Sequence, residues 1–268
     1  MCTWLEVSPS GYYSWRTRQA SKRAREDQLL LEKITRIYWR SRGRYGSPRV
    51  FQALKDEGLS VGRKRVERLM REGGLKARCV RVTRRTPALK QFREAGENVL
   101  QQMAKPSRCN QAWVGDVTYL KLNGRWQYLS TVMDVYSRRI LAWSLSPHRR
   151  TELTVATLKQ ALKRRDYPEG LVFHSDRGIE YLGYEFRAAL KQHGIRQSFN
   201  RAGHCTDNAM MESFFHTLKG ELIRDARYEN VAALRKALSG YINGFYNRTR
   251  MHSSINYLSP VEYERRAA

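Results

Sequence analysis

Three acidic residues in the second half of the chain occur in settings that suggest chemistry. Asp116 lies inside an apolar segment with the composition of a strand, Asp176 closely follows a short apolar run, and Glu212 lies on a segment with helical periodicity. Aspartate is depleted in strands, and a buried charge is costly without a partner. Carboxylate oxygens suit Mg²⁺, and two such ions can stabilise the attacking and leaving oxygens of a phosphoryl transfer. The acids therefore indicate a metal-dependent site.

Each acid also has a plain structural explanation. Asp116 can be a local residue at a strand edge, Asp176 a residue of the turn that follows it, and Glu212 a solvated residue on a helix. The metal-site hypothesis therefore depends on whether the fold brings the three carboxylates together.

The order of the expected elements favours such a convergence. Asn123-Gly124 is a strong hairpin signal because both residues tolerate positive φ. Three strands joined by short turns, followed by alternating helices and apolar strands, imply an α/β core of mixed direction over residues 109–225, with its chemistry in loops at strand ends. The expected elements are strands at 113–122, 125–134, 139–145, 171–173 and 195–199, and helices at 151–165, at 184–193 and from about 207.

The helix that carries Glu212 has two distinct faces. At about 100° per residue, its apolar stripe consists of Met211, Phe215, Leu218 and Leu222, and the polar stripe beside it consists of Glu212, His216 and Lys219. Glu212 is thus expected at the rim of the buried face, where its side chain can point along the edge of the sheet.

The N-terminal region, residues 1–75, is expected to be helical. Ser47-Pro48 is a strong helix start, because serine can cap free amides and proline suits the first helical position. A helix over 48–57, a glycine-bearing turn and a third helix predict a helix-turn-helix over about 44–75. The alternative is an ordinary helical hairpin with a solvated basic face. The cations of the third helix suit contacts with DNA phosphates and guanine edges: Arg63, Lys64, Arg65 and Arg68.

The charge of the chain points to a polyanionic partner. Fifty Lys and Arg residues against 25 Asp and Glu give a formal net charge of +25, which favours nucleic acid. Half of the basic residues but only 10 of the acidic ones lie before residue 106. A basic linker is expected over 76–108, either as a solvated tether or as a segment that follows a phosphate backbone.

The composition excludes several protein classes. No apolar run approaches the roughly 18 residues that a membrane span needs, and the first residues lack the pattern of a signal peptide. The four cysteines are scattered, without metal-binding spacing or a disulfide framework. We expect a soluble, intracellular protein with reduced cysteines.

The acids and their neighbours resemble a known superfamily. Asp116, Asp176 and Glu212, with 35 residues between the last two and Lys219 seven residues beyond the glutamate, resemble the catalytic signature of the DDE transposases and retroviral integrases. The surrounding motifs are similar to those of second-frame (OrfB) transposases of a bacterial insertion-sequence family: Trp113-x-x-Asp116-x-Thr118-Tyr119, His174-Ser175-Asp176-Arg177-Gly178, Asp207-Asn208-Ala209 and Tyr246-Asn247-x-x-Arg250-x-His252.

This resemblance implies a fold, a reaction and a site. The fold is a ribonuclease-H-like mixed five-stranded sheet with flanking helices. The reaction is DNA cleavage and joining at terminal inverted repeats, in which a 3′-hydroxyl attacks a phosphodiester. Asp116, Asp176 and Glu212 are then the catalytic residues and hold two Mg²⁺ ions, for which Mn²⁺ can substitute. Lys219 and Arg177 contact DNA.

Other residues near the acids are interpreted as structural. We expect His174 to pack at its strand end, Asp134 to end a hairpin strand, and Asp207 to cap the helix of Glu212. Residues 226–268 are expected to form a C-terminal helical extension.

The resemblance also implies partners and a location. The partners are double-stranded DNA, as element ends and target, a homo-oligomer assembled on that DNA, and the first-frame product as a fusion or a separate chain. The location is the bacterial cytoplasm, in association with the nucleoid. Two alternatives stay open: a ribonuclease-H-like structure-specific nuclease, which activates only water, and a non-catalytic DNA-binding regulator.

Overall fold

The computed structural model describes most of the chain, and its contacts divide the chain into two units. The units are Met1–Arg78 and Cys79–Ala268, and each is described by itself. Residues 79–95, which carry most of the predicted basic linker, lie outside the described residues. The structure describes residues 4, 7–17, 21–78, 96–201, 205–224 and 226–267, with only the backbone of 205 and 206.

The first unit is helical, as predicted. Its core consists of apolar side chains that are fully buried, including Ile34, Val50, Leu54 and Val66. One expected detail is wrong: helix α3 begins at Ser47, and no side chain caps it. A turn that contains two glycines joins α3 to α4 and completes the helix-turn-helix. The helices are α1 (Pro9–Thr17), α2 (Lys22–Arg40), α3 (Ser47–Asp56) and α4 (Arg63–Glu72).

The second unit is built on a mixed five-stranded sheet of order β3-β2-β1-β4-β5. β1 and β2 form an antiparallel hairpin whose turn residues, Asn123 and Gly124, both have positive φ. β1–β4 and β4–β5 are parallel pairs. The predicted mixed α/β core is therefore confirmed. The strands are β1 (Ala112–Leu122), β2 (Arg125–Asp134), β3 (Ile140–Ser146), β4 (Val172–Ser175) and β5 (Arg196–Phe199).

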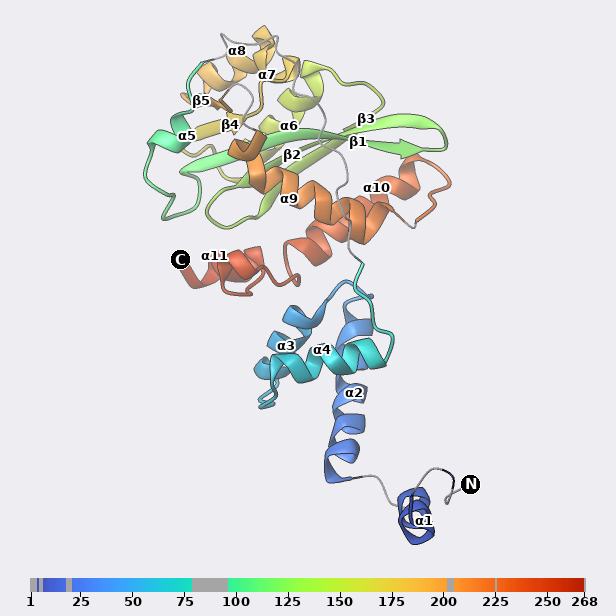
Figure 1. Ribbon diagram of the computed structural model, residues 1–268. Coiled ribbons are helices and arrows are strands. Elements are labelled where there is room, and N and C mark those ends of the chain that lie inside the picture. The colour runs from blue at the N-terminus through green and yellow to red at the C-terminus, as the bar shows by residue number, and fades with distance from the viewer. Residues whose placement is uncertain are drawn as a thin grey trace. The chain divides into compact units, whose positions relative to one another are not determined.

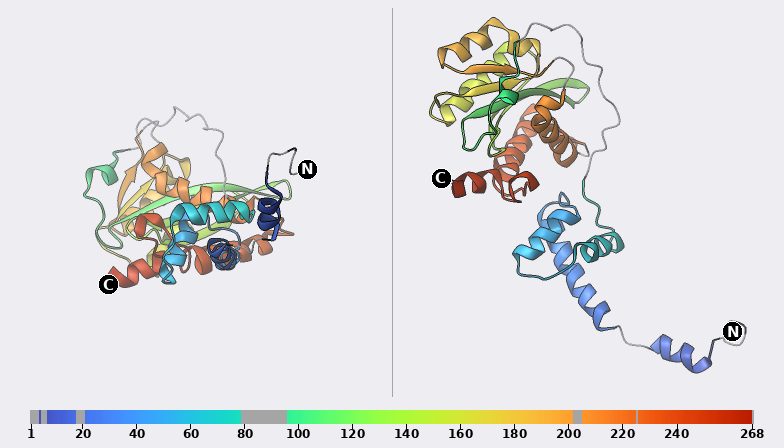
Figure 2. Two further views of the ribbon diagram at one scale, coloured as in Figure 1. Left: turned by 60° about the horizontal axis from the view of Figure 1, so that its bottom comes forward. Right: turned by 60° about the vertical axis from the view of Figure 1, so that its left-hand side comes forward.

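Helices cover both faces of this sheet (Figures 1 and 2). On one face, apolar residues of α6, α7 and α8 pack with Trp113 and Phe173. On the other face, α9 and α10 pack with Val114 and Leu129. The helical elements of this unit are α5 (Val99–Gln102), α6 (Thr151–Arg164), α7 (Ile179–Leu182), α8 (Tyr184–Gln192), η1 (Cys205–Asn208), α9 (Ala209–Leu218), η2 (Lys219–Ile223), α10 (Val231–Ser239), η3 (Gly240–Tyr246), η4 (Ser253–Ile255) and α11 (Pro260–Ala267).

The C-terminal segment packs into the second unit. The side-chain amide of Asn247 donates to the carbonyl of Ile140 and accepts from its N–H. Arg250 forms a buried ion pair with Glu221 at 2.8 Å, and Tyr241 donates a hydrogen bond to the same carboxylate. The Tyr-Asn-x-x-Arg motif of the resemblance therefore fastens the last helices to the sheet.

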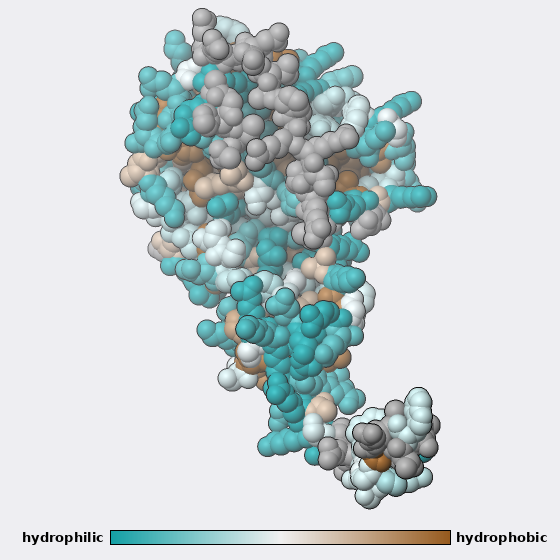
Figure 3. Space-filling model, in the orientation of Figure 1, coloured by the Kyte–Doolittle hydropathy of each residue, from teal (hydrophilic) through white to brown (hydrophobic). Residues whose placement is uncertain are grey.

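The surface of both units is largely hydrophilic in the view of Figure 3. Among the described residues, no helix is long and apolar enough to cross a membrane.

Candidate active site

Asp116 and Asp176 are brought together by the pairing of β1 with β4. The strands are parallel, and Val114 is the partner of His174. The same register, continued by two residues, places Asp116 at the level of Asp176. Because β4 ends at Ser175, β1 has no β4 residue paired beside it from this level onward. The two predicted acids thus share one end of the parallel part of the sheet.

Asp116 and Asp176 are half-buried, which makes their carboxyl groups hard to ionise. Burial raises the pKa of Asp116 well above its ordinary value, and the neighbouring Asp176 carboxylate raises it further. Burial also raises the pKa of Asp176, and the charge of Glu180 acts in the same direction. Each acid accepts one backbone hydrogen bond that favours ionisation, but these bonds do not offset the burial.

The pair has the donors that a divalent cation needs. Oδ1 of Asp116 accepts from the N–H of Val117 at 2.7 Å, and Oδ1 of Asp176 accepts from the N–H of Gly178 at 3.0 Å. Within the described ranges, no hydrogen bond or ion pair engages Oδ2 of either acid. Two hard oxygen donors that repel each other are stabilised by a cation between them, so the pair fits a divalent metal ion.

Glu212 lies on α9, and its side chain is exposed. This helix starts against β1, because Nδ2 of its N-cap residue Asn208 donates to the carbonyl of Gly115 at 3.3 Å. In the described part of the chain, no three His, Cys, Asp or Glu side chains are grouped closely enough to hold a metal ion. The structure therefore joins two of the three predicted acids and leaves the third on the helix that begins beside them.

Lys219 comes directly after α9, and its ammonium group lies close to β1. Its Nζ is 4.7 Å from the ring centroid of Tyr119. Burial lowers the pKa of Lys219, and the negative charge of Asp116 acts in the opposite direction. The predicted DNA-contact lysine is thus close enough to Asp116 for the two charges to interact.

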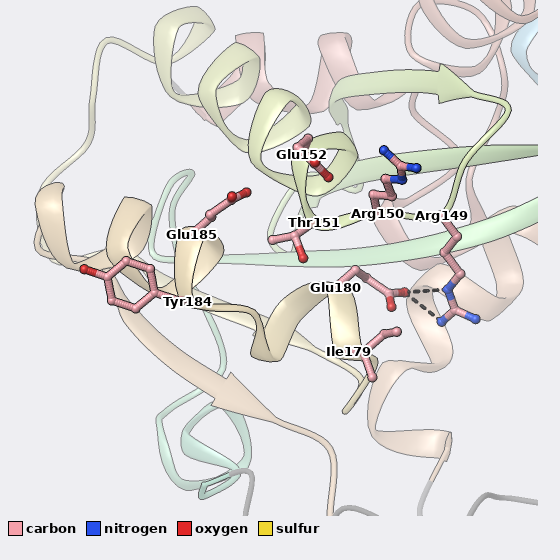
Figure 4. A pocket seen from close by; sticks show the side chains of 8 residues that line it. All are labelled: Arg149, Arg150, Thr151, Glu152, Ile179, Glu180, Tyr184 and Glu185. Carbon is pink, nitrogen blue, oxygen red and sulfur yellow. Dashed lines mark hydrogen bonds and ion pairs between the residues drawn. The ribbon is translucent and has the colours of Figure 1, made fainter.

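A buried acid beside the pair, Glu180, was not predicted. Its side chain is 1% exposed, and its Oε1 accepts two hydrogen bonds from Arg149, at 3.0 and 2.7 Å (Figure 4). Its Oε2 is buried and has no hydrogen-bond partner in the described structure. The only available sequence signal was its spacing of four residues from Asp176, about one helical turn. Arg149 comes from the distant β3–α6 loop, and no local pattern links it to the site.

Gly178 separates the carboxylates of Asp176 and Glu180. A Cβ atom added to Gly178 would lie 2.9 Å from Oδ1 of Asp176 and 2.9 Å from Oε1 of Glu180. Its φ of −63° suits any residue, so space rather than backbone conformation demands glycine here. The close approach of the two acids is therefore possible only without a side chain between them.

Two further residues of the Asp176 motif have partners within the protein. His174 is fully buried between Ser198 Oγ, at 2.8 Å from Nδ1, and Asn200 Oδ1, at 2.7 Å from Nε2. This position agrees with the expected packing role, and burial lowers the pKa of His174. Arg177 donates from Nε to the carbonyl of Asn200 at 2.7 Å. Its contact with DNA stays a prediction.

The two acids interpreted as structural have such roles, although one expected detail is wrong. Asp134 is fully buried and accepts hydrogen bonds from the N–H groups of Asn110 and Tyr136. Asp207 does not cap α9. Instead, it accepts from the backbone and side chain of Arg201 and from Asn98, and the Arg201 side chain lowers the pKa of Asp207 to about 2.

The four predicted DNA contacts of α4 fall into two pairs. Arg65 and Arg68 are both bound to Asp27 of α2, each at 2.6 Å, and they hold the pKa of that carboxyl group below its ordinary value. Arg63 and Lys64 are exposed. The structure thus gives the first pair a role in helix packing and leaves the second pair at the surface.

Protein families and known relatives agree with this geometry. Family models described as "Integrase core domain" match residues 106–205 and 212–267, and an "HTH-like domain" model matches residues 24–83. The chain is 37% identical over 263 residues to an uncharacterized 31 kDa protein of insertion element IS600 from Shigella sonnei, covering 98% of this chain and 97% of that protein. It is also 37% identical to the transposase InsF of IS3A from Escherichia coli K12, covering 98% and 92%.

The chain belongs to the family of insertion-sequence transposases. It is a DNA transposase, a polynucleotidyl transferase with integrase-type catalysis. Its helix-turn-helix unit is the part of the chain that matches the "HTH-like domain" model. A chain of the simian T-cell lymphotropic virus intasome, solved with PP2A regulatory subunit B56 gamma, shares the fold with a TM-score of 0.50 at 14% identity. The match covers 86% of this chain and 74% of that one.

Proposed function

We propose that this transposase cuts and joins DNA at the terminal inverted repeats of an insertion sequence, through attack of a 3′-hydroxyl on a phosphodiester. The observation that carries the proposal is the half-buried pair of Asp116 and Asp176, whose mutual repulsion makes a divalent cation favourable at this position. Glu212, on the helix that starts beside Gly115, is the third ligand in this proposal.

The three acids would hold two Mg²⁺ ions, and Mn²⁺ would substitute. Bound metal supplies charge stabilisation at the attacking and leaving oxygens. The protein contributes the placement of both acids, because Asp116 lies on β1 and Asp176 directly follows β4, the parallel neighbour of β1. Glu212 is exposed, so its carboxylate would be accessible to a metal ion and to DNA.

The basic residues would position DNA around these acids. Lys219 interacts with the charge of Asp116, which puts its ammonium group where a phosphate next to the reacting bond would lie. Arg177 adds a second cation beside Asp176. In the first unit, Arg63 and Lys64 offer exposed charges to the DNA backbone.

The proposal also includes assembly. Two DNA ends must be held together for joining, so we propose a homo-oligomer on DNA and association with the first-frame product, either as a fusion or as a separate chain. The transposase then acts in the bacterial cytoplasm on nucleoid DNA.

A strand-joining experiment tests the proposal. Purified protein is mixed with Mg²⁺, a labelled element end and a second DNA. We expect a joined product that is lost with EDTA and lost in Asp116→Asn, Asp176→Asn and Glu212→Gln, while DNA binding is retained. A matched control is Asp166→Asn, an exposed acid in the loop between α6 and β4.

Two results would count against the proposal. Cleavage without joining, with both ends supplied, favours a structure-specific nuclease. Unchanged joining in all three acid variants refutes the assignment of the site.

A further inference from the structure

An exposed aromatic pair lies on the β1–β2 hairpin, outside both apolar cores. Tyr119 of β1 is 55% exposed and Trp126 of β2 is 48% exposed. Their ring centroids are 5.2 Å apart with an interplanar angle of 88°. Neither ring belongs to the clusters that pack against the two faces of the sheet. Folding therefore leaves about half of each side chain in contact with water.

Two lysines flank this pair, one at each ring. Nζ of Lys121 is 5.7 Å from the ring centroid of Trp126, and these two residues are direct cross-strand partners. Nζ of Lys219 is 4.7 Å from the ring centroid of Tyr119. We call Tyr119, Trp126, Lys121 and Lys219 the hairpin platform. It combines exposed π-faces with ammonium groups, the combination that binds unpaired nucleotides through base stacking and phosphate contacts.

The hairpin platform begins next to the catalytic acids. Tyr119 lies three residues after Asp116 on the same strand, in the part of β1 that β4 does not cover, because the β1–β4 pairing ends at Val114. Lys219 interacts with the charge of Asp116 and contacts the ring of Tyr119. From there the hairpin extends beyond helices α6–α8 (Figure 1). A strand that enters the site would meet the platform next.

We propose that the hairpin platform binds unpaired nucleotides of a DNA strand that leads into the active site. The bases stack on Trp126 and Tyr119, and Lys121 and Lys219 contact the phosphates. The inference rests on the proposed function, since that function supplies a DNA end at Asp116. The net charge of +25 favours a polyanionic occupant over a protein, because an apolar protein surface would leave both ammonium groups without a counter-charge.

Binding measurements on the full chain test the platform without requiring catalysis. Fluorescence anisotropy compares two labelled duplexes of the same arbitrary sequence, one blunt and one with an unpaired run of thymidines at its 3′ end. We expect Trp126→Ala and Tyr119→Ala to weaken binding of the tailed DNA by about tenfold each, because loss of base–aromatic stacking has effects of that order. Binding of the blunt DNA stays unchanged, and Trp126→Phe, which keeps a ring, retains most of the affinity.

A matched control comes from the first unit. Trp39 is an exposed tryptophan in a similar edge-to-face pair with Tyr38, also 5.2 Å between centroids. Trp39→Ala should not change the preference for tailed DNA. Lys121→Ala should weaken binding of the tailed DNA and reduce the salt dependence of that binding by roughly one counterion, as expected for a lost phosphate contact.

The outcomes separate this inference from the proposed function. The inference is overturned if Trp126→Ala and Tyr119→Ala lose equal affinity for blunt and tailed DNA, or if they lose affinity for neither. The second result would instead favour a protein as the partner of the hairpin platform. If either of these results is found and the wild-type chain joins DNA ends, the platform is refuted and the proposed function stands. If the wild-type chain does not join ends but the tail-specific loss is observed, the platform stands and the proposed reaction fails.

Discussion

Asp116 on β1 lies level with Asp176, the first residue after β4, because the parallel pairing of Val114 with His174, continued by two residues, joins positions that are sixty residues apart in sequence. This register explains why the two acids meet although nothing local connects them. Adjacent strands hold their backbones about 4.8 Å apart, so side chains at the same level and on the same face lie close together. Burial raises the pKa of both carboxyl groups, and two such carboxylates with few other partners suit the divalent cation that we propose.

The first prediction concerns the stability cost of this pair. Where folding raises the pKa of a carboxyl group, the folded chain is most stable at a pH below the ordinary pKa of aspartate. This part of the stability is lost as the pH rises through the raised pKa. Without divalent ions at about pH 7, the Asp116→Asn variant should therefore unfold at a higher temperature than the wild-type chain. A gain of about 1 kcal/mol in the free energy of unfolding corresponds to an increase of a few degrees. The difference should vanish at about pH 4. Thermal unfolding measured across pH in EDTA tests this, and a variant that is less stable at neutral pH contradicts it.

The second prediction concerns the space at Gly178. In Gly178→Ala, the added Cβ meets Asp176 and Glu180 at 2.9 Å, so at least one carboxylate must move. We expect strand joining to fall about tenfold or more while DNA affinity is kept, because misplaced catalytic groups cost about that much. The control is Gly240→Ala, where nothing lies within 4 Å and φ is −61°. Equal activity of the two variants would show that the spacing is not critical.

The third prediction separates the cations of α4. The double change Arg63→Ala and Lys64→Ala should weaken binding to duplex DNA and lower its salt dependence, without changing thermal stability. Arg65→Ala should instead lower the unfolding temperature of the first unit, because it removes a 2.6 Å contact with Asp27. Anisotropy titrations and thermal unfolding of the same variants distinguish the two effects. Unchanged affinity in the double variant would exclude these residues from the DNA interface.

The fourth prediction concerns the ion pair that attaches the C-terminal segment. Arg250 and Glu221 are 7% and 5% exposed, and the pKa of Arg250 is raised by its hydrogen bonds with Glu221 despite burial. Arg250→Met should cost about 3–5 kcal/mol, because it leaves a buried carboxylate without its cation. Replacing both partners by apolar residues should recover most of that loss. Chemical denaturation measures both, with the exposed Arg266→Ala as control; similar losses in the single and double variants would contradict the prediction.

The sequence predicted the elements of the second unit closely, and for identifiable reasons. Asn123-Gly124 determines its hairpin locally through positive φ at both residues, and the periodicity of β1 and α9 follows from which side chains must be buried. Asp116 could be selected because a carboxylate inside an apolar strand is rare. Such signals depend only on residues that are close in sequence, so they can be interpreted without knowledge of the fold.

Other features of the site depend on residues that are distant in sequence. Glu180 pairs with Arg149 across the gap between α7 and the β3–α6 loop, and Arg65 pairs with Asp27 across two helices. The sequence shows the charges but not their partners, so it cannot separate Arg65 and Arg68 from Arg63 and Lys64. Asp207 was expected to cap a helix because it precedes one, yet its carboxylate turns to Arg201 instead.

By itself, the sequence determined which residues could act: three carboxylates, a basic chain around them and the order of strands and helices that carries them. Only the tertiary structure decided which of these side chains meet. Strand register placed Asp116 level with Asp176, and packing buried Glu180 beside them. The spatial arrangement also left Glu212 exposed on α9 and set Lys219 against Tyr119. The physical reason is that side-chain type and local propensity are properties of short segments, whereas burial, pKa and ion pairing depend on neighbours supplied by distant parts of the chain.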